Sequence, residues 1–205
     1  MYTDIQEVLD NIRSLQEQLE LAFEEAREKF RCTLQDGRIR IAAEVREFQR
    51  KYRVSTIRYL LDADLGSVVT APVIYSMVVP LAIIDITFTL YQHVCFRAYG
   101  IPRVQRLAYL VNDRHKLGYL NVIEKANCAY CGYANGVIAY AREILSRTEQ
   151  YWCPIRHAHR VLSAHERYPG FFPYGDAQGY QQGLQGKRDE LVTDNRNGLA
   201  HGDNQ

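Results

Sequence analysis

A long apolar run in the first half of the chain limits what this sequence can fold into. Residues 67–96 contain a single charged side chain, Asp85, and the eighteen residues from Ser67 to Ile84 contain none. A run of this length meets the usual criterion for a helix that crosses a bilayer. Two prolines, Pro72 and Pro80, interrupt it, and membrane helices tolerate proline better than soluble helices do. The sequence therefore predicts a membrane-spanning or re-entrant segment, within residues 54–100.

Three arrangements of this run are open. It can be one tilted span, a re-entrant hairpin bent near Pro80, or the buried core helix of a soluble protein. Halves divided at Pro80 would be about fifteen residues long, too short to cross a hydrocarbon core of ~30 Å at 1.5 Å per residue. Basic residues flank the run in similar numbers on both sides, which favours the hairpin, whereas the length of the run favours the span.

Asp85 has two interpretations. Together with His93, about two helical turns further on, it could form a proton or ion relay. The simpler hypothesis, which we favour, is that Asp85 lies at the wet end of a shorter apolar stretch and interacts with other helices.

Composition and the N-terminus bear on location. The chain has 25 Lys and Arg against 24 Asp and Glu, a net charge of +1, which argues against a protein that wraps nucleic acid. Fifteen tyrosines accompany one tryptophan, and tyrosine suits half-wet surfaces and membrane interfaces. The first residues have no basic n-region and no apolar h-region, so no cleavable signal peptide is expected. We expect a cytoplasmic (inner) membrane protein with a cytosolic N-terminus and membrane lipid as a partner.

Residues 1–53 predict a helical, coiled-coil-like arm. Apolar residues follow an a/d heptad pattern over residues 4–31: Ile5, Val8, Ile12, Leu15, Leu19, Ala22 and Ala26. A turn signal at Gln35-Asp36-Gly37 precedes a second apolar stripe, from Ile41 to Tyr52, so a helical hairpin is the simple interpretation. The arm either packs on itself or binds a protein partner or a second copy of the chain through the heptad stripe.

The chemical centre of the sequence is a cysteine and histidine constellation. Cys128 and Cys131 form a Cys-x2-Cys pair, and Cys153-Pro-x-x-His157 follows. In the reducing cytosol such a pair is more often a metal or redox motif than a disulfide. Cys-Ala-Tyr-Cys-Gly-Tyr resembles the first knuckle of rubredoxins and zinc ribbons, although the second knuckle of those proteins is replaced here by Cys153 and His157. Together the four residues make a Cys3His set, which is common in closed structural zinc sites.

This shared site depends on the path of the chain between the two pairs. An unbroken helix from Cys131 to Cys153 would hold them about 33 Å apart, so the site requires a chain reversal, for which Asn135-Gly136 offers a break. Zinc is the leading prediction and iron the alternative cofactor. Two other interpretations are open: a redox dithiol at Cys128 and Cys131, or cysteines that are small buried hydrophobic residues without shared chemistry. His159 and His165 are possible substitutes for His157, and Cys32 and Cys95 are interpreted as packing residues.

The remaining sequence completes an all-α prediction. Residues 101–163 are expected to form a helical metal-binding unit, in which residues 103–125 carry an amphipathic pattern. Residues 164–205 are rich in Gly, Gln, Asn and Asp and predict a flexible tail. No catalytic motif is found, so the leading hypothesis is a non-catalytic membrane-associated protein with a structural zinc site, acting as an assembly or interaction component. The alternatives are a membrane-bound electron-transfer or thiol-redox protein and a soluble helical adaptor.

Overall fold

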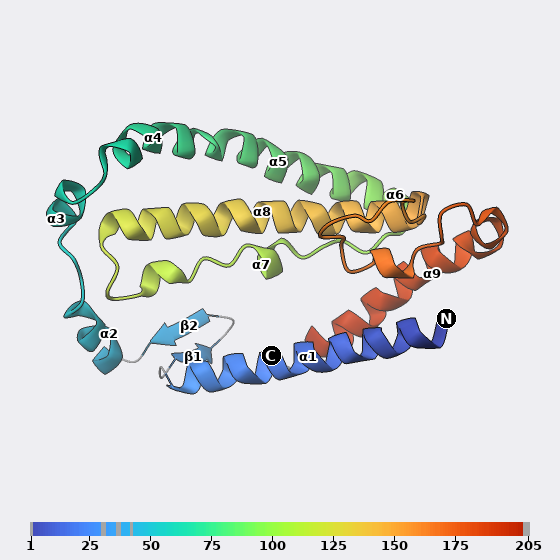
Figure 1. Cartoon of the computed structure of the whole chain (residues 1–205), viewed down its shortest axis with the longest axis horizontal. Coiled ribbons are helices and arrows are strands. Elements are labelled where there is room, and N and C mark those ends of the chain that lie inside the picture. The colour runs from blue at the N-terminus through green and yellow to red at the C-terminus, as the bar shows by residue number, and fades with distance from the viewer. Residues whose placement is uncertain (1, 30–31, 36–37, 42, 203–205) are drawn as a thin grey trace. The chain divides into compact units, whose positions relative to one another are not determined.

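The computed structural model describes residues 2–29, 32–35, 38–41 and 43–202, and it is predominantly helical, as the sequence predicts (Figure 1). The chain divides into two compact units. Unit 1 comprises Met1–Leu61 and Asp113–Lys125, and unit 2 comprises Asp62–Asn112 and Ala126–Gln205.

Unit 1 begins with the predicted N-terminal helix. Helix α1 (Tyr2–Lys29) is built from strong helix formers such as Leu, Glu, Gln and Arg. Side chains of its heptad stripe are exposed, with Ile12 46 %, Leu15 63 % and Leu19 53 % accessible. Within unit 1 the stripe is therefore not covered over these residues.

A short β-hairpin stands where a helical hairpin was predicted, and that prediction is wrong. Strands β1 (Cys32–Gln35) and β2 (Arg38–Ile41) pair antiparallel, with Gln35 opposite Arg38. The sequence Arg-Ile-Arg-Ile of β2 alternates with period two, which suits a strand and not a helix. Helices α2 (Ala43–Arg50) and α3 (Thr56–Leu61) follow, and the 3-10 turn η2 (Arg114–Lys116) also belongs to unit 1.

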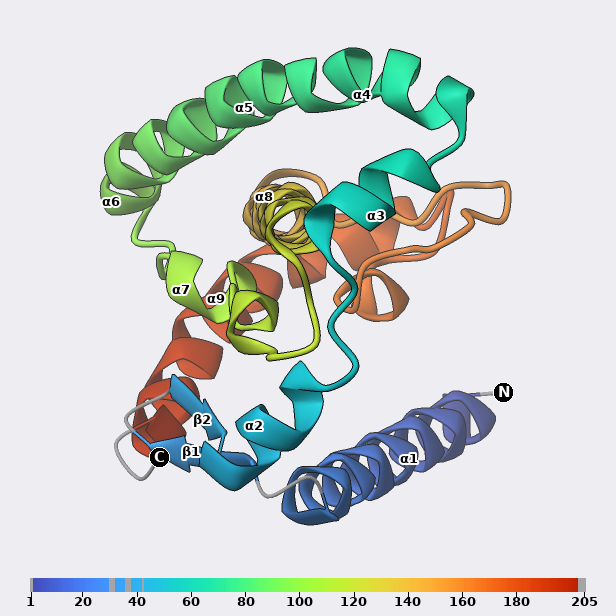
Figure 2. The ribbon, with the colours of Figure 1, turned by 90° about the vertical axis from the view of Figure 1, so that its left-hand side faces the viewer.

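In unit 2 the apolar run forms one long helical rod. It consists of α4 (Leu65–Ser76), α5 (Val78–Tyr91), the π-turn η1 (Gln92–Phe96) and α6 (Arg97–Tyr99). Pro80 has no N–H to donate to the Ser76 carbonyl. The α-helical hydrogen-bond pattern is interrupted at Met77, the residue after Ser76, which separates α4 from α5. The rod curves but does not reverse at Pro80, so the re-entrant hairpin is not formed (Figure 2).

Glycine ends the rod. Gly100 adopts a left-handed conformation with φ of 68°, which costs other residues steric strain. The Ile101 N–H then donates to the Phe96 carbonyl at 2.9 Å, as in a Schellman motif. Because Phe96 and Ile101 are both buried, this cap also joins the core, which contains Val104, Tyr140 and Ile144 as well.

The other long element, α8 (Val122–Trp152), lies alongside the rod and runs in the same direction (Figures 1 and 2). Contacts near its start involve Tyr75 and those near its end involve Tyr99. We name residues 101–112 the return segment, because they carry the chain back from the end of the rod. Its only helix among the described residues is α7 (Arg106–Tyr109), so the helical prediction for residues 103–125 is largely wrong.

The C-terminal region is helical, not a flexible tail. Helix α9 (Ala177–Gly202) follows the 3-10 turn η3 (Tyr168–Gly170). Asp176 immediately precedes α9, and its carboxylate accepts the Gly179 N–H at 2.9 Å. Leu191 of α9 is 2 % exposed. The α9 residue Arg188 donates to the Tyr151 carbonyl at 3.0 Å and lies over the Tyr151 ring. Contacts with the end of α8 thus stabilise a segment whose composition suggested disorder.

Candidate functional site

The four predicted metal ligands lie in two separate places. Cys128 and Cys131 are in the first half of α8, whereas Cys153 follows its last residue and His157 is in the loop beyond. Helix α8 continues through Asn135-Gly136, where the chain was expected to reverse. The Asn135 side chain donates to the Cys131 carbonyl at 2.9 Å, a contact along one helix face.

The unbroken helix separates the two pairs. Cys131 and Cys153 are 22 residues apart, which corresponds to about 33 Å along a helix. Among the described residues, no group of three or more His, Cys, Asp or Glu side chains is arranged to hold a metal ion. The prediction of a chain reversal is therefore wrong, and the structure does not bring Cys153 or His157 to Cys128 and Cys131. The predictions of a zinc or iron cofactor, and of a redox dithiol at Cys128 and Cys131, stay predictions.

The surroundings of Cys153 and His157 differ from those of metal ligands. Partial burial of the thiol, and then the negative charge of Glu149, raise the pKa of Cys153, which disfavours the thiolate that binds metals. His157 stacks on the Tyr168 ring at 6.1 Å, and its backbone N–H donates to the Tyr168 hydroxyl at 2.7 Å. His165, a possible substitute, bonds instead to Glu149 at 2.9 Å.

Asp85 makes the most specific polar contact of the apolar rod. Its carboxylate accepts two hydrogen bonds from Arg106 of the return segment, at 2.9 and 2.6 Å, and one from the Tyr133 hydroxyl at 3.2 Å. The part of the hypothesis in which Asp85 interacts with other helices is thus confirmed, because Arg106 belongs to α7 and Tyr133 to α8. The part that places Asp85 at a wet end is wrong, because Asp85 is only 7 % exposed and lies within the continuous rod. His93 is exposed and bonds to the Thr89 carbonyl, so it does not share the buried face of Asp85, as the relay hypothesis required.

The rod buries two polar residues and exposes many apolar ones. Asp85 is 7 % exposed and Gln92 2 %, and Gln92 bonds through its amide to both the N–H and the carbonyl of Val104. The most apolar 18-residue window of Leu65–Tyr99 is only 6 % buried. Its outward-facing side chains are aliphatic and largely accessible, including Val69, Val73, Met77, Val79, Ile83, Ile86 and Leu90. A core helix of a soluble protein has the opposite arrangement.

Tyrosine hydroxyl groups join the rod to α8. Tyr130 donates to the Ile74 carbonyl at 2.8 Å, Tyr140 bonds with Thr89 at 3.3 Å, and Tyr91 bonds with Thr148 at 3.1 Å. Aromatic rings therefore fill this contact while their hydroxyl groups satisfy polar partners. The high tyrosine content was noted in the sequence, but its place between two helices could not be read from composition.

An uncharged stretch of α8 lies beside the uncharged part of the rod. Residues 126–141 contain no charged side chain, between Lys125 and Arg142. The return segment packs closely on this stretch at two glycines, since a Cβ added to Gly136 would lie 2.7 Å from the Tyr109 carbonyl oxygen and one at Gly132 would lie 3.3 Å from that of Val111. The absence of charge over 126–141 was visible in the sequence and went unused.

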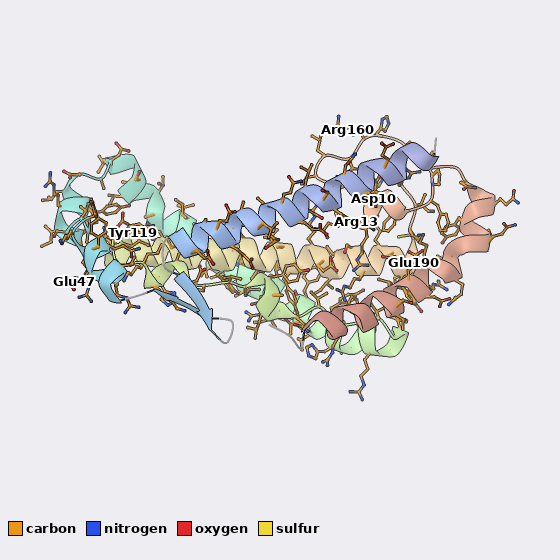
Figure 3. All side chains as sticks on the ribbon, turned by 90° about the horizontal axis from the view of Figure 1, so that it is seen from below. Asp10, Arg13, Glu47, Tyr119, Arg160 and Glu190 are labelled. Carbon is orange, nitrogen blue, oxygen red and sulfur yellow. The ribbon has the colours of Figure 1, made fainter. Side chains whose placement is uncertain are left out.

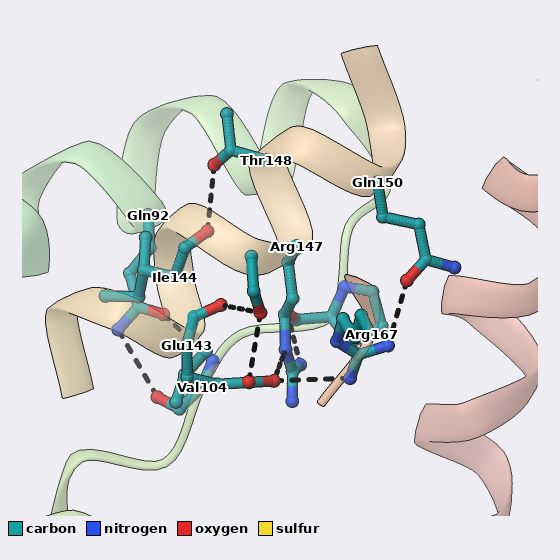
Figure 4. Close-up of polar contacts among 10 residues, drawn as sticks. Gln92, Val104, Glu143, Ile144, Arg147, Thr148, Gln150 and Arg167 are labelled. Carbon is teal, nitrogen blue, oxygen red and sulfur yellow. Dashed lines mark hydrogen bonds and ion pairs between the residues drawn. The ribbon is translucent and has the colours of Figure 1, made fainter. Parts of the chain in front are cut away.

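The second half of α8 carries a charged network instead (Figure 4). Glu143 accepts hydrogen bonds from Arg147 at 2.8 Å, Arg167 at 3.2 Å and Ser146 at 3.0 Å. Burial alone would raise the pKa of Glu143, but the hydrogen bond from Arg147 and the charge of Arg167 outweigh it, so the pKa lies below its ordinary value. With its oxygens occupied by donors, this carboxylate holds segments together and is poorly suited to proton transfer.

No family model, curated protein or solved structure matches the chain. Its function is therefore argued from its own residues.

Proposed function

We propose that this chain is a non-catalytic, membrane-associated assembly component. The exposed face of the rod would contact lipid, while α8 and the return segment would form its protein-facing side. The zinc site formed by all four predicted ligands is not part of this proposal, because α8 separates Cys131 from Cys153.

The observation that carries the proposal is the reversed polarity of the rod. The helix Leu65–Tyr99 is long and apolar enough to cross a bilayer, yet most of its aliphatic side chains are exposed, whereas Asp85 and Gln92 are buried and bond to residues of α8. Exposure of such an apolar surface to water costs roughly 25 cal/mol per Å² of free energy, whereas contact with lipid tails avoids this cost. The soluble-adaptor alternative requires these same side chains to form a core.

Carbonate extraction of membranes from cells that produce the full chain tests this proposal. We expect the chain to stay in the membrane pellet and to float with the lipid in a density gradient, which distinguishes insertion from aggregation. Release into the carbonate supernatant would overturn the proposal.

A pair of variants makes the test specific to the rod. Val73 and Ile83 are 68 % and 57 % exposed, so V73E combined with I83E should leave the fold intact and reduce the membrane-bound fraction. Each charged group in a hydrocarbon layer costs about 3 kcal/mol on insertion scales. Leu107 is 81 % exposed but lies outside the rod, so L107E is the matched control and should bind membranes as the unaltered chain does.

The assembly role is assigned to α1, and its partner to a second copy of the chain. The exposed heptad stripe has Ile12 at an a position and Leu15 at the next d position, an arrangement typical of two-stranded coiled coils. The exposed pair Asp10 and Arg13, joined at 3.2 Å, lies off this stripe (Figure 3). An a/d stripe is complementary to an identical stripe, so a second α1 is a suitable occupant.

The oligomeric state of the full chain in mild detergent, measured by light scattering, tests this assignment. We expect a dimer for the unaltered chain and a monomer for L15D. Leu21 is also apolar and 62 % exposed, but it occupies a c position, so L21D should remain dimeric. A monomeric unaltered chain, or equal effects of the two variants, would contradict pairing through the heptad stripe.

A further inference from the structure

Unit 2 contains a basic pocket in the loop that follows α8. The pocket has a volume of about 400 Å³, within the ordinary range for small-ligand sites. Its walls include Arg156, His157, His159 and Arg160, and no carboxylate is among its lining residues. Since the whole chain carries nearly equal numbers of acidic and basic residues, this concentration of basic groups is local.

The walls of the pocket are fixed by contacts with the rest of the unit. The Arg156 N–H donates to the Phe172 carbonyl at 2.8 Å, and the Phe172 N–H donates to the Pro154 carbonyl at 2.8 Å. Tyr168 holds His157 through its hydroxyl and ring. On the outer side of the loop, Ser163 has a φ of 58°, and its carbonyl accepts a hydrogen bond from Arg142 of α8. A non-glycine residue held in this region of φ requires surrounding contacts that impose it.

One polar atom of a residue that lines the pocket lacks a protein partner. The Nε of Arg156 is buried and has no hydrogen-bond acceptor among the described residues. A buried guanidinium N–H without an acceptor is unfavourable, and an anion oxygen is a strong acceptor for it. Arg160, labelled in Figure 3, lies on the same loop, and both arginines are among the residues that line the pocket.

We propose that this pocket binds a phosphate group. Guanidinium forks match phosphate oxygens in geometry and charge, and the Tyr168 and Tyr174 side chains at the pocket wall add hydroxyl donors. Apolar lining residues such as Val161 and Pro173 suit the organic part of a phosphate ester.

The phosphate can belong to a lipid headgroup or to a water-soluble ester. Tyr99 ends the rod and Trp152 ends α8, directly before the loop. Their rings contact each other at 5.2 Å, and the two side chains are 42 % and 47 % exposed. Tyrosine and tryptophan concentrate at the headgroup level of membranes. The lipid source rests on the proposed membrane association, whereas phosphate binding itself does not.

Two probes distinguish the sources. Glycerol 3-phosphate is titrated by calorimetry into the full chain in a neutral detergent, with glycerol as the blank. Vesicles of phosphatidylcholine alone, or of phosphatidylcholine with phosphatidic acid, are used in flotation assays. Binding of glycerol 3-phosphate, with equal flotation on both kinds of vesicle, indicates a water-soluble ester. Stronger flotation with vesicles that contain phosphatidic acid than with phosphatidylcholine vesicles indicates a lipid headgroup. Either result supports the pocket.

Variants assign the binding to these arginines. Arg160 is exposed, so R160Q is expected to fold, and it should weaken binding about tenfold because a charge-assisted hydrogen bond is lost. R156Q should weaken it at least as much, with folding checked by circular dichroism. R103Q makes the same charge change at an exposed residue outside the pocket and should bind normally.

Two results would overturn the pocket: no binding of either phosphate probe by the unaltered chain, or equal losses in R160Q and R103Q. A failure of membrane association would appear differently, as lost flotation with phosphatidylcholine vesicles. The glycerol 3-phosphate titration measures phosphate binding by the pocket whether or not the chain associates with membranes.

Discussion

Two carboxylates of unit 2 are neutralised by arginine in different ways. Asp85 on the apolar rod has one arginine, Arg106, which approaches from the return segment and is 40 % exposed, while the Asp85 side chain is 10 % exposed. Glu143 on α8 has two arginines, and all three of these side chains are 18–19 % exposed. One of the two, Arg147, lies four residues further along the same helix, a spacing at which helical side chains meet.

The difference shows which of the two sites depends on tertiary structure. Glu143 keeps a local partner as long as α8 is helical. Asp85 has no such partner, because the eighteen residues before it are nearly all apolar and uncharged and its countercharge comes from 21 residues further along the chain. The position of the return segment therefore decides whether Asp85 is paired or is an isolated charge on an apolar helix.

Removal of Arg106 should have the largest effect. R106L leaves a buried carboxylate without its cation, and we expect the free energy of unfolding to fall by about 3 kcal/mol, the lower end for a broken buried pair because Arg106 is partly exposed. Denaturant unfolding in mild detergent, followed by circular dichroism, measures this change.

The double variant D85N with R106L is the control for this prediction. It removes the charge that R106L leaves unpaired, so it should recover most of the lost stability. R103L removes an exposed arginine three residues away and should change stability by less than about 0.5 kcal/mol. If R106L and R103L behave alike, Asp85 does not depend on its arginine.

A methyl group at Gly136 should have the next largest effect. Its Cβ would lie 2.7 Å from the Tyr109 carbonyl oxygen, so G136A must displace the return segment that carries Arg106. We expect a loss of about 2 kcal/mol, typical of overpacking.

A second glycine variant is the control for this packing effect. Beyond the backbone of its own helix, a Cβ added to Gly186 of α9 would meet no atom of the described residues within 4 Å. G186A should therefore stabilise the protein by up to about 1 kcal/mol through helix propensity. Opposite signs for G136A and G186A are the result to look for in thermal unfolding.

Loss of the Glu143 charge should be milder, because other donors and acceptors of the network remain. E143Q is expected to cost about 1–2 kcal/mol at neutral pH. Since the folded-state pKa of Glu143 is lowered, its stabilising contribution is present above the ordinary glutamate pKa and is lost as the pH falls through the folded-state value.

The pH dependence separates this effect from a simple packing defect. Acidification should destabilise E143Q less than the unaltered chain, so the two stability curves approach each other at low pH. E190Q is the control, because Glu190 is 54 % exposed and pairs only with Lys187 among the contacts described. Parallel curves for E143Q and the unaltered chain would contradict a charged Glu143.

The sequence predicted the elements that are determined locally. The heptad pattern of α1 and the apolar length of the rod depend on residue type and spacing alone, and both are present as helices. The β-hairpin was also readable, in the alternation of Arg38-Ile39-Arg40-Ile41, but one apolar stripe was extended through it. In contrast, α9 is a helix whose composition predicts a flexible tail, and it is held by contacts with Tyr151 and Gln150 that lie far away in sequence.

The candidate site depended more on tertiary structure. Several basic residues follow the rod, and nothing local selects Arg106 as the partner of Asp85. Asn135-Gly136 has the composition of a turn, yet Gly136 is required because the Tyr109 carbonyl approaches α8 at that point. A glycine needed for close packing has the same appearance in a sequence as a glycine needed for a turn.

The continuity of α8 at Gly136 also keeps the Asp85 and Glu143 regions apart. A distance between labels placed along α8 measures this continuity directly. Cys131 and Cys153 are exposed, so spin labels can be attached to them after the other three cysteines are replaced by serine. We expect a distance of about 33 Å between the labelled backbone positions, set by the helical rise. A much shorter distance would restore the chain reversal.

Zinc content provides the matching test on unlabelled protein, and here the smallest effect is expected. In a shared Cys3His site, C131S and C153S would both remove the metal, because each deletes one of four ligands. In the structure, Cys153 lies at the far end of α8 from Cys128 and Cys131. The C153S variant should therefore leave the zinc content of the purified chain unchanged. Equal zinc losses in C131S and C153S would show that Cys153 lies near Cys128 and Cys131 in the metal-bound protein. The uncharged and charged halves of α8 would then not be held apart by one continuous helix.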